Sequence, residues 1–116
     1  MPTESCVFCQ IVNNEVDASI VYRDPEAVAF RDIHPAAPTH ILIVPTKHVA
    51  SLNQLQDGND SLLENLFAVV RQLVMQEGLE QGGYRLVINT GDNGGQTVHH
   101  LHLHLLGGRR MHWPPG

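Results

Sequence analysis

A chain of 116 residues with a formal net charge of −5 is long enough for one domain and too acidic to offer nucleic acid a basic surface. No apolar run approaches the roughly 18 residues that a membrane span requires, and the start of the sequence lacks the pattern of a signal peptide. We therefore expect a cytoplasmic protein without a membrane segment. Because Lys47 is the single lysine, a bound phosphate would be held by imidazoles and backbone N–H groups in a pocket.

The first half of the chain predicts one short helical segment and then a series of strands. Residues 6–12 fit a short helix or turn. Apolar residues and turn signals such as Asp24-Pro25 predict strands at 19–23, 27–32 and 40–44. The proline-rich loop 34–38 should be stiff and separates the last two strands.

The clearest helix is predicted at 59–79. Its core-facing side should carry the apolar residues that recur at helical spacing, which are Leu62, Leu63, Leu66, Phe67, Val70, Leu73 and Val74. Ser61 and Glu64 fit a capping box at the start, and Gly78 fits the C-terminal stop. A further strand at 84–89 follows. Several strands and one long helix predict an α+β domain with an antiparallel sheet covered by a helix.

Residues 98–106 form the most informative segment, because His100, His102 and His104 alternate with leucines. Strict alternation predicts a strand with three imidazoles on one face and leucines on the other. Aligned imidazoles can follow the oxygens of a phosphate or chelate a metal, and they change charge near neutral pH. His102 has a histidine on each side and is the natural nucleophile. His99 falls on the leucine face, and we give it no catalytic role.

The glycine-rich segment 91–97 leads into these histidines. Glycines let backbone N–H groups approach an anion closely, and Thr97 adds a hydroxyl that can donate to a phosphate or to a leaving group. Asn89 is expected at the end of the adjacent strand, within reach of a phosphate or sugar oxygen. The segment is therefore interpreted as an anion cradle and not as an ordinary hairpin turn.

Residues 100–106 match the His-φ-His-φ-His-φ-φ signature (φ is apolar) of the histidine triad (HIT) superfamily. Segments 30–48 and 94–98 and the Trp-Pro-Pro-Gly end at 107–116 resemble its histidine-triad nucleotide-binding (HINT) branch. The resemblance covers nearly the whole chain and implies a single HIT domain over 1–116. It also implies a five-stranded antiparallel sheet with one long and one short helix, and a homodimer joined into a continuous ten-stranded sheet.

The resemblance further implies hydrolysis of purine nucleoside phosphoramidates, for example adenosine 5′-monophosphoramidate to AMP and an amine, through a covalent nucleotidyl-histidine. The implied nucleophile is His102; the carbonyl of His100 would fix its tautomer, and His40 would support the histidines from the neighbouring strand. His104 and Thr97 complete the implied catalytic set. AMP, GMP or their phosphoramidates are the expected ligands. The residues implied to hold them are Phe8, Ile11, Phe30, Asp32, Ile33, Asn89, Gly95, Gln96, Thr97, His102 and His104.

Cys6 and Cys9 form a C-x-x-C pair, which in a cytoplasmic protein indicates metal binding or redox chemistry, whereas two buried free thiols are the alternative. Bacterial members of the superfamily often bind zinc with such a pair and two histidines. The resemblance thus implies a closed, structural zinc set of Cys6, Cys9, His48 and His100. No cofactor would then be required for catalysis.

Three other activities stay open. One is a dinucleoside polyphosphate hydrolase, against which the short chain and the Trp-Pro-Pro-Gly end argue. Another is a zinc-stabilised nucleotide-binding or interaction module. The last is a metallohydrolase whose three histidines hold a catalytic metal, which predicts complete loss of activity when the metal is removed.

Overall fold

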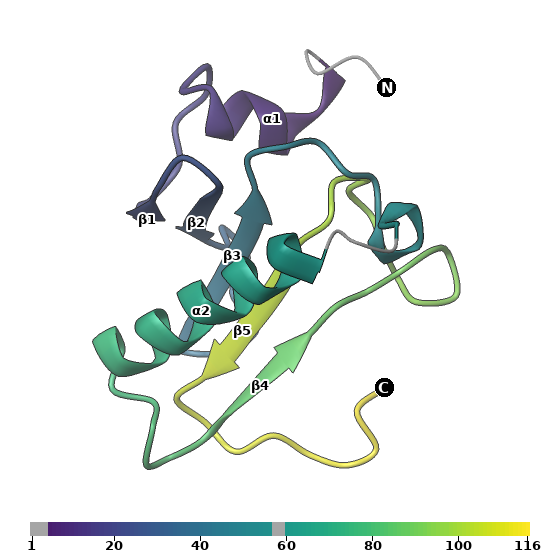
Figure 1. Cartoon of the computed structure of the whole chain (residues 1–116). Helices are drawn as coiled ribbons and strands as arrows, with labels where there is room; N and C mark the ends of the chain where they lie inside the picture. The colour runs from purple at the N-terminus through teal and green to yellow at the C-terminus, as the bar shows by residue number, and fades with distance from the viewer. Residues whose placement is uncertain (1–4, 57–59) are drawn as a thin grey trace.

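The computed structural model describes residues 5–56 and 60–116, which form a five-stranded sheet and two α-helices (Figure 1). The sheet has the order β1-β2-β3-β5-β4, with every neighbouring pair antiparallel. The strands are β1 (Ile20–Arg23), β2 (Ala27–Arg31), β3 (Thr39–Pro45), β4 (Tyr84–Val87) and β5 (Leu103–Gly107). The helices are α1 (Val7–Val12) and α2 (Asp60–Gln76), with a 3₁₀ turn, η2 (Leu52–Gln54), before α2. The predicted α+β fold is confirmed.

The histidine strand starts later than predicted, whereas the other predicted strands and helices end within three residues of their observed bounds. β5 begins at Leu103, so His100, which lies in a bend, and His102 precede the paired part of the strand. Its partner β3 ends at Pro45, which has no N–H to continue the ladder, and β4 ends opposite His104. The N–H of Leu101 instead donates to the carbonyl of Val49, at 2.6 Å. Because the chain turns there, His99 is exposed and does not join the leucine face.

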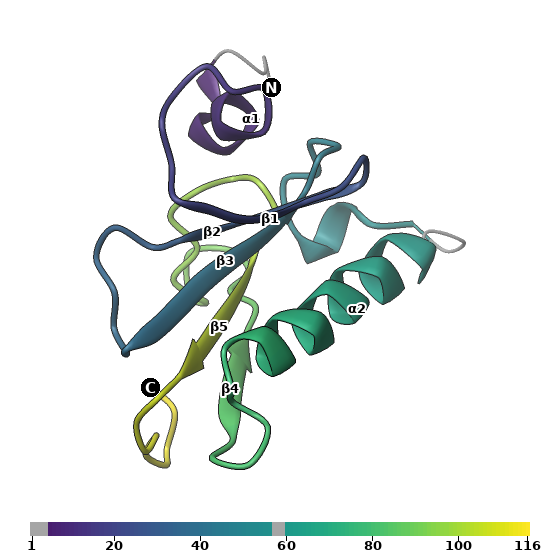
Figure 2. The same cartoon turned by 90° about the vertical axis from the view of Figure 1, so that its left-hand side faces the viewer.

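The two helices lie on opposite sides of the sheet (Figure 2). Residues of one parity on β3, such as Ile41 and Ile43, face α2 and belong to the larger core, together with Leu103 and Leu105 of β5. Residues of the other parity, such as Leu42, face α1 and belong to a smaller core. This alternation is what allows one sheet to carry two different surfaces.

The core stripe of α2 differs from the prediction at two positions. Val69 is 3% exposed and was not predicted, whereas Phe67 is 36% exposed and was predicted to face the core. The buried residues of α2 are Leu66, Val69, Val70, Leu73 and Val74. This set follows the i, i+3, i+4, i+7, i+8 spacing of a single stripe, and Phe67 lies about 100° away from Leu66 around the helix axis.

At the start of α2 the predicted cap is wrong, whereas at its end the predicted glycine stop is correct. Asp60 is already helical, so Ser61 lies inside the helix and the predicted capping box is wrong; Asn59 lies outside the described residues. Gly78 adopts φ +69° and donates its N–H to the carbonyl of Met75, while Leu79 donates to Val74. These two bonds form a Schellman motif, which confirms the glycine stop. No helix in the described part of the chain is long and apolar enough to cross a membrane.

Candidate active site and metal centre

A cavity of about 510 Å³ lies on the α1 side of the sheet, a size suited to a small ligand. Phe30 of β2 is the register partner of Leu42 of β3, and Leu42 is the partner of His104 of β5. These three residues therefore form a cavity floor that runs across three neighbouring strands. α1 adds Phe8, whose ring meets Phe30 edge-on with centroids 5.3 Å apart.

Many of the predicted nucleotide-binding residues line this cavity. They are Phe8, Ile11, Phe30, Asp32, Ile33, Thr97, His102 and His104. Lining residues that the sequence analysis missed include Val16, Asp17, Ala18, Leu42 and Val98. The alternation of β3 could have identified Leu42, because it shares a face with His40. The segment 16–18 shows no periodicity, so only the fold brings it to the cavity.

His102 is held in the tautomer that a nucleophile needs. Its Nδ1 lies 2.7 Å from the backbone carbonyl of His100, which can only accept, so Nδ1 carries the proton. The lone pair is then on Nε2. His102 is 5% exposed, and burial lowers its pKa below the ordinary value, so the ring stays neutral near pH 7. The side chain lines the cavity with an imidazole ready to attack an electrophile.

A second chain of hydrogen bonds fixes the tautomers of His40 and His104. The N–H of Ala36 donates to Nδ1 of His40 at 3.0 Å, so neutral His40 carries its proton on Nε2. That Nε2–H lies 3.0 Å from Nδ1 of His104, which accepts it and keeps its own proton on Nε2. Burial lowers the pKa of His104 to about 4 and also lowers that of His40. His104 therefore offers an N–H donor beside His102, with the ring centroids 5.0 Å apart.

Asp32, His40 and His104 also bring potential metal ligands within 4.8 Å of one another. The tautomers argue against a metal there. A metal on Nε2 of His40 would move the proton to Nδ1, against the N–H of Ala36. Asp32 instead accepts from the N–H of His34 at 2.8 Å, and its second oxygen lies 3.4 Å from His40. We interpret the cluster as a hydrogen-bonded network that positions His104.

The three histidines of the triad do not converge on one point. Nδ1 of His100 points to the cysteines, and Nδ1 of His102 is occupied by a carbonyl. Among the described residues, potential metal ligands converge in two groups. One group contains His100 and the other contains His104, and neither contains His102. The geometry therefore gives no support to a catalytic metal held by all three rings.

Gln96 shapes the glycine-rich loop from inside the protein. Its amide donates to the carbonyls of Ala50 and Val98 at 2.7 and 3.1 Å, and its oxygen accepts from the N–H of Gly91 at 3.1 Å. A buried amide satisfied in this way organises the loop and does not reach the cavity. Gly95, with φ +80° and its N–H donated to Asp92, also lies outside the cavity lining, as does Asn89. Of this loop, Thr97 lines the cavity directly.

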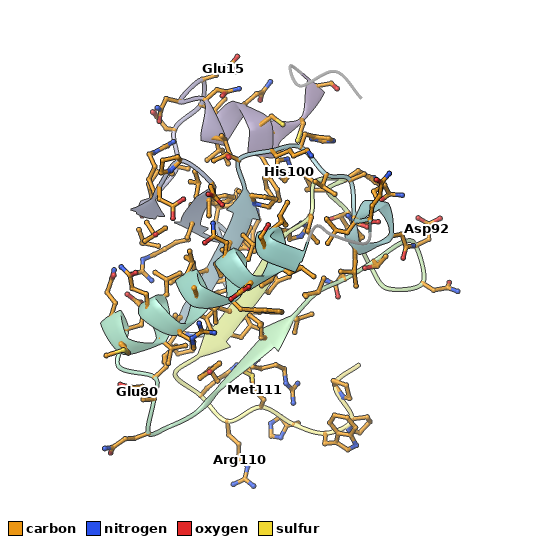
Figure 3. The ribbon with its side chains drawn as sticks, in the orientation of Figure 1. Glu15, Glu80, Asp92, His100, Arg110 and Met111 are labelled. Carbon is orange, nitrogen blue, oxygen red and sulfur yellow. The ribbon has the colours of Figure 1, made fainter. Side chains whose placement is uncertain are left out.

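Cys6, Cys9, His48 and His100 form a candidate metal centre, with potential ligand atoms within 4.8 Å of one another. Sγ of Cys9 lies 3.2 Å from Nδ1 of His48, and Sγ of Cys6 lies 3.4 Å from Nδ1 of His100. Cys6 caps α1 and Cys9 lies within it, whereas the two histidines come from the body of the fold. Figure 3 shows His100 beside α1.

The chemistry of this donor set fits a structural zinc ion. His100 donates its Nε2–H to the carbonyl of Pro45 at 2.8 Å, which directs the lone pair of Nδ1 toward both sulfurs. Burial raises the pKa of the Cys9 thiol to about 11, and a bound cation would offset that cost by stabilising the thiolate. Two thiolates and two imidazoles would supply the four protein ligands that are typical of a structural zinc site.

Comparisons with known proteins place the chain in a family. Residues 13–111 match the family model of the HIT domain. A HIT family hydrolase from Legionella pneumophila Philadelphia 1 is 51% identical, and its crystal structure superposes with a TM-score of 0.94 over 96% of this chain and 99% of that chain. A histidine triad nucleotide-binding protein from Candida albicans is 30% identical, with a TM-score of 0.81 over 94% of this chain and 82% of that chain. The chain belongs to the HIT domain family.

A plant relative bears on the metal centre. The chain is 46% identical to the 14 kDa zinc-binding protein of Zea mays, over 95% of this chain and 87% of the maize protein. Together with the geometry of Cys6, Cys9, His48 and His100, this similarity supports the prediction of a structural zinc site.

Proposed function

We propose that this protein belongs to the HINT branch and hydrolyses purine nucleoside phosphoramidates to a nucleoside monophosphate and a free amine. The observation that carries the proposal is the free Nε2 of His102, set beside the N–H donor of His104 at one end of a nucleotide-sized cavity. The Legionella relative named as a hydrolase and the Candida relative named as nucleotide-binding support it.

The proposed reaction has two displacements at phosphorus. In the first, Nε2 of His102 forms a bond to phosphorus, and the P–N bond to the leaving amine breaks as the amine nitrogen takes up a proton from solvent. In the second, water attacks the nucleotidyl-histidine, the bond to Nε2 breaks, the nucleotide leaves with the oxygen of water, and the proton lost by that water returns to solvent. His104 donates to a phosphoryl oxygen in both steps, which stabilises the negative charge that develops there.

The other cavity residues have binding roles in this proposal. Thr97 places its hydroxyl near the leaving nitrogen, and the carboxylate of Asp32 accepts from the ribose hydroxyls. Phe8, Phe30 and Ile33 hold the base between apolar surfaces. Zinc bound at the candidate metal centre by Cys6, Cys9, His48 and His100 would hold α1 against the body of the fold, away from the reacting atoms.

Kinetics of His102→Ala test the proposal. We expect kcat/KM for adenosine 5′-monophosphoramidate to fall by about 10⁴-fold or more, because the nucleophile is lost. Affinity for AMP, measured by calorimetry, should change little. The matched control is His99→Ala, which removes an exposed neighbouring imidazole and should keep the wild-type rate. Unimpaired turnover by His102→Ala would contradict the mechanism, and faster cleavage of diadenosine tetraphosphate than of the phosphoramidate would favour the dinucleoside polyphosphate hydrolase.

We further propose that the protein is a cytoplasmic homodimer in which the two sheets join into one. β4 is an edge strand, and an unpaired edge exposes backbone groups that a second copy can pair. Exposed apolar side chains that a dimer interface could bury also support the proposal, namely Met75 on α2, Tyr84 on β4 and Trp113 near the C-terminus. Light scattering should give twice the 12.8 kDa mass of the chain, whereas a monomer at micromolar concentration would contradict the proposal.

A further inference from the structure

The cavity has a far end that the proposed chemistry does not use. The cavity floor runs from His104 through Leu42 to Phe30, and Phe30 is in turn the register partner of Ile20 on β1. From β5 to β1 is three strand spacings, about 14 Å. The segment 16–18, which joins α1 to β1, lines the cavity at this end. A nucleotide with its phosphate at the histidines would direct its base toward this segment.

Asp17 puts a carboxylate in this segment. The residue is exposed, and no hydrogen bond or ion pair links its side chain to another described residue. The other carboxylate of the cavity, Asp32, accepts from the N–H of His34, lies near His40 and is assigned to the ribose in the proposed function. Asp17 is therefore free to accept hydrogen bonds from a ligand, at the opposite end of the cavity from the reacting histidines.

The edge of the base that reaches this end determines which purine fits. The six-membered ring of a purine lies away from the ribose, so its Watson–Crick edge extends furthest from the phosphate. Guanine presents two adjacent donors there, N1–H and the N2 amino group, and the two oxygens of a carboxylate can accept both. Adenine presents the N1 lone pair beside its amino group, and that lone pair would face a negative oxygen.

We infer that Asp17 selects guanine, so that guanosine phosphoramidates are the preferred substrates. This inference rests on the proposed function and names the substrate class of the same site. The side chains of Phe8 and Phe30 are apolar and recognise either purine by shape, which leaves Asp17 as the group that distinguishes the two bases. Because Asp17 is exposed to water, its contribution is smaller than that of a fully buried carboxylate.

Steady-state kinetics of this chain with each substrate, giving kcat and KM separately, test the inference. We expect wild-type kcat/KM to favour guanosine 5′-phosphoramidate over the adenosine analogue by about tenfold. Asp17→Asn should lower that ratio by about tenfold or more, because an amide donates to N1 of adenine and accepts from its amino group. The change should appear mainly in KM, since Asp17 lies far from the reacting atoms.

A matched control comes from the same segment. Glu15 points outward from the fold (Figure 3) and does not line the cavity, so Glu15→Gln should keep the wild-type ratio. A wild-type ratio at or below one, or an unchanged ratio in Asp17→Asn, would overturn the inference.

The affinities of GMP and AMP, measured by calorimetry on the same variants, separate this inference from the proposed reaction. Tighter binding of GMP that is lost in Asp17→Asn would support the role of Asp17 even if neither phosphoramidate were hydrolysed. In that case the proposed reaction alone would fail. Equal affinities for GMP and AMP in the wild-type protein would overturn the inference whether or not phosphoramidates are cleaved.

Discussion

The two faces of the sheet are built from the same strands but have different chemistry. On the α2 face, Ile41, Ile43, Leu103 and Leu105 are fully buried and entirely apolar. On the α1 face, buried histidines are mixed with apolar residues beside a cavity. The alternation of side chains along each strand separates the two roles, so that one face stabilises the fold and the other holds reactive groups in place.

The α1 face can bury polar groups because each has a partner. His102 donates to a carbonyl, His40 accepts from the N–H of Ala36, and His100 donates to Pro45. No buried side-chain nitrogen or oxygen of the described residues lacks a hydrogen bond. The functional face is therefore held in place by hydrogen bonds, to which a zinc ion at the candidate metal centre would add.

A core truncation on the α2 face should affect stability and spare activity. Leu73→Ala removes a fully buried side chain and should lower the free energy of unfolding by about 2–5 kcal/mol. Chemical denaturation measures the loss, and kcat/KM below the transition should stay near the wild-type value. Met75→Ala, at a side chain that is 66% exposed, is the control and should change stability little. A large fall in kcat/KM for folded Leu73→Ala would contradict the separation of the two faces.

Removal of the metal should destabilise the α1 face. Chelation of a zinc-loaded protein should lower the free energy of unfolding by about 2–4 kcal/mol, because binding to the folded state alone is lost. Metal content and the thermal midpoint are the measurements. Cys9→Ser should already have the lower midpoint and should not respond further to the chelator. If a protein with one zinc per chain kept the same thermal midpoint after the chelator had removed the zinc, that result would contradict the role given to the metal centre.

Acid should lower the contribution of the α1 face to the free energy of unfolding before it affects the contribution of the α2 face. The folded-state pKa of His104 is about 4, below the ordinary 6.5, because of burial and of the neighbouring His102 and His40; Asp32 opposes this shift. The unfolded chain therefore takes up a proton at higher pH than the folded chain. The contribution of neutral His104 to the free energy of unfolding is therefore complete above pH 6.5 and is lost as the pH falls from 6.5 toward 4.

Denaturation at several pH values measures this loss. His104→Asn should show a shallower decline in the free energy of unfolding over that range. His112→Asn, at an exposed histidine, is the control and should keep the wild-type slope. An unchanged slope in His104→Asn would show that other groups cause the pH dependence.

The smallest expected effect is at the ion pair between the sheet and the end of α2. Arg31 binds Glu77 through two contacts of 2.9 and 3.1 Å, but its side chain is 42% exposed. Glu77→Gln should therefore cost less than about 1 kcal/mol, and the cost should shrink further in high salt. Denaturation at two salt concentrations measures it. A loss above 2 kcal/mol would show that this contact does more than join the two layers.

The sequence was informative wherever periodicity or a local signal decides the structure. The strands, α2, its glycine stop and the histidine alternation could all be predicted, because each depends on neighbouring residues. The start of β5 could not, because it depends on where β3 and β4 end. The exposure of Phe67 depends on how α2 is rotated about its axis against the sheet. The spacing of apolar residues does not determine that rotation to within one residue.

The site was predictable in its residues and less so in its connections. The triad and the four residues of the metal centre follow from the family resemblance. The hydrogen bonds from Ala36 to His40 and from His40 to His104, which set the tautomers, could not be predicted, because every residue except proline has a backbone N–H and the sequence does not show which one is used. The buried amide of Gln96 and the lining role of Asp17 likewise depend on tertiary contacts that local patterns do not contain.

The stereochemical course at phosphorus tests most directly the claim that His102 forms a covalent nucleotidyl intermediate. A nucleoside phosphoramidate made chiral at phosphorus with sulfur, hydrolysed in water enriched in ¹⁸O, gives a product whose configuration can be determined. Two successive in-line displacements, first by Nε2 of His102 and then by water, each invert the centre and should give net retention. Net inversion would mean that water attacks the substrate directly, which contradicts nucleophilic catalysis by His102.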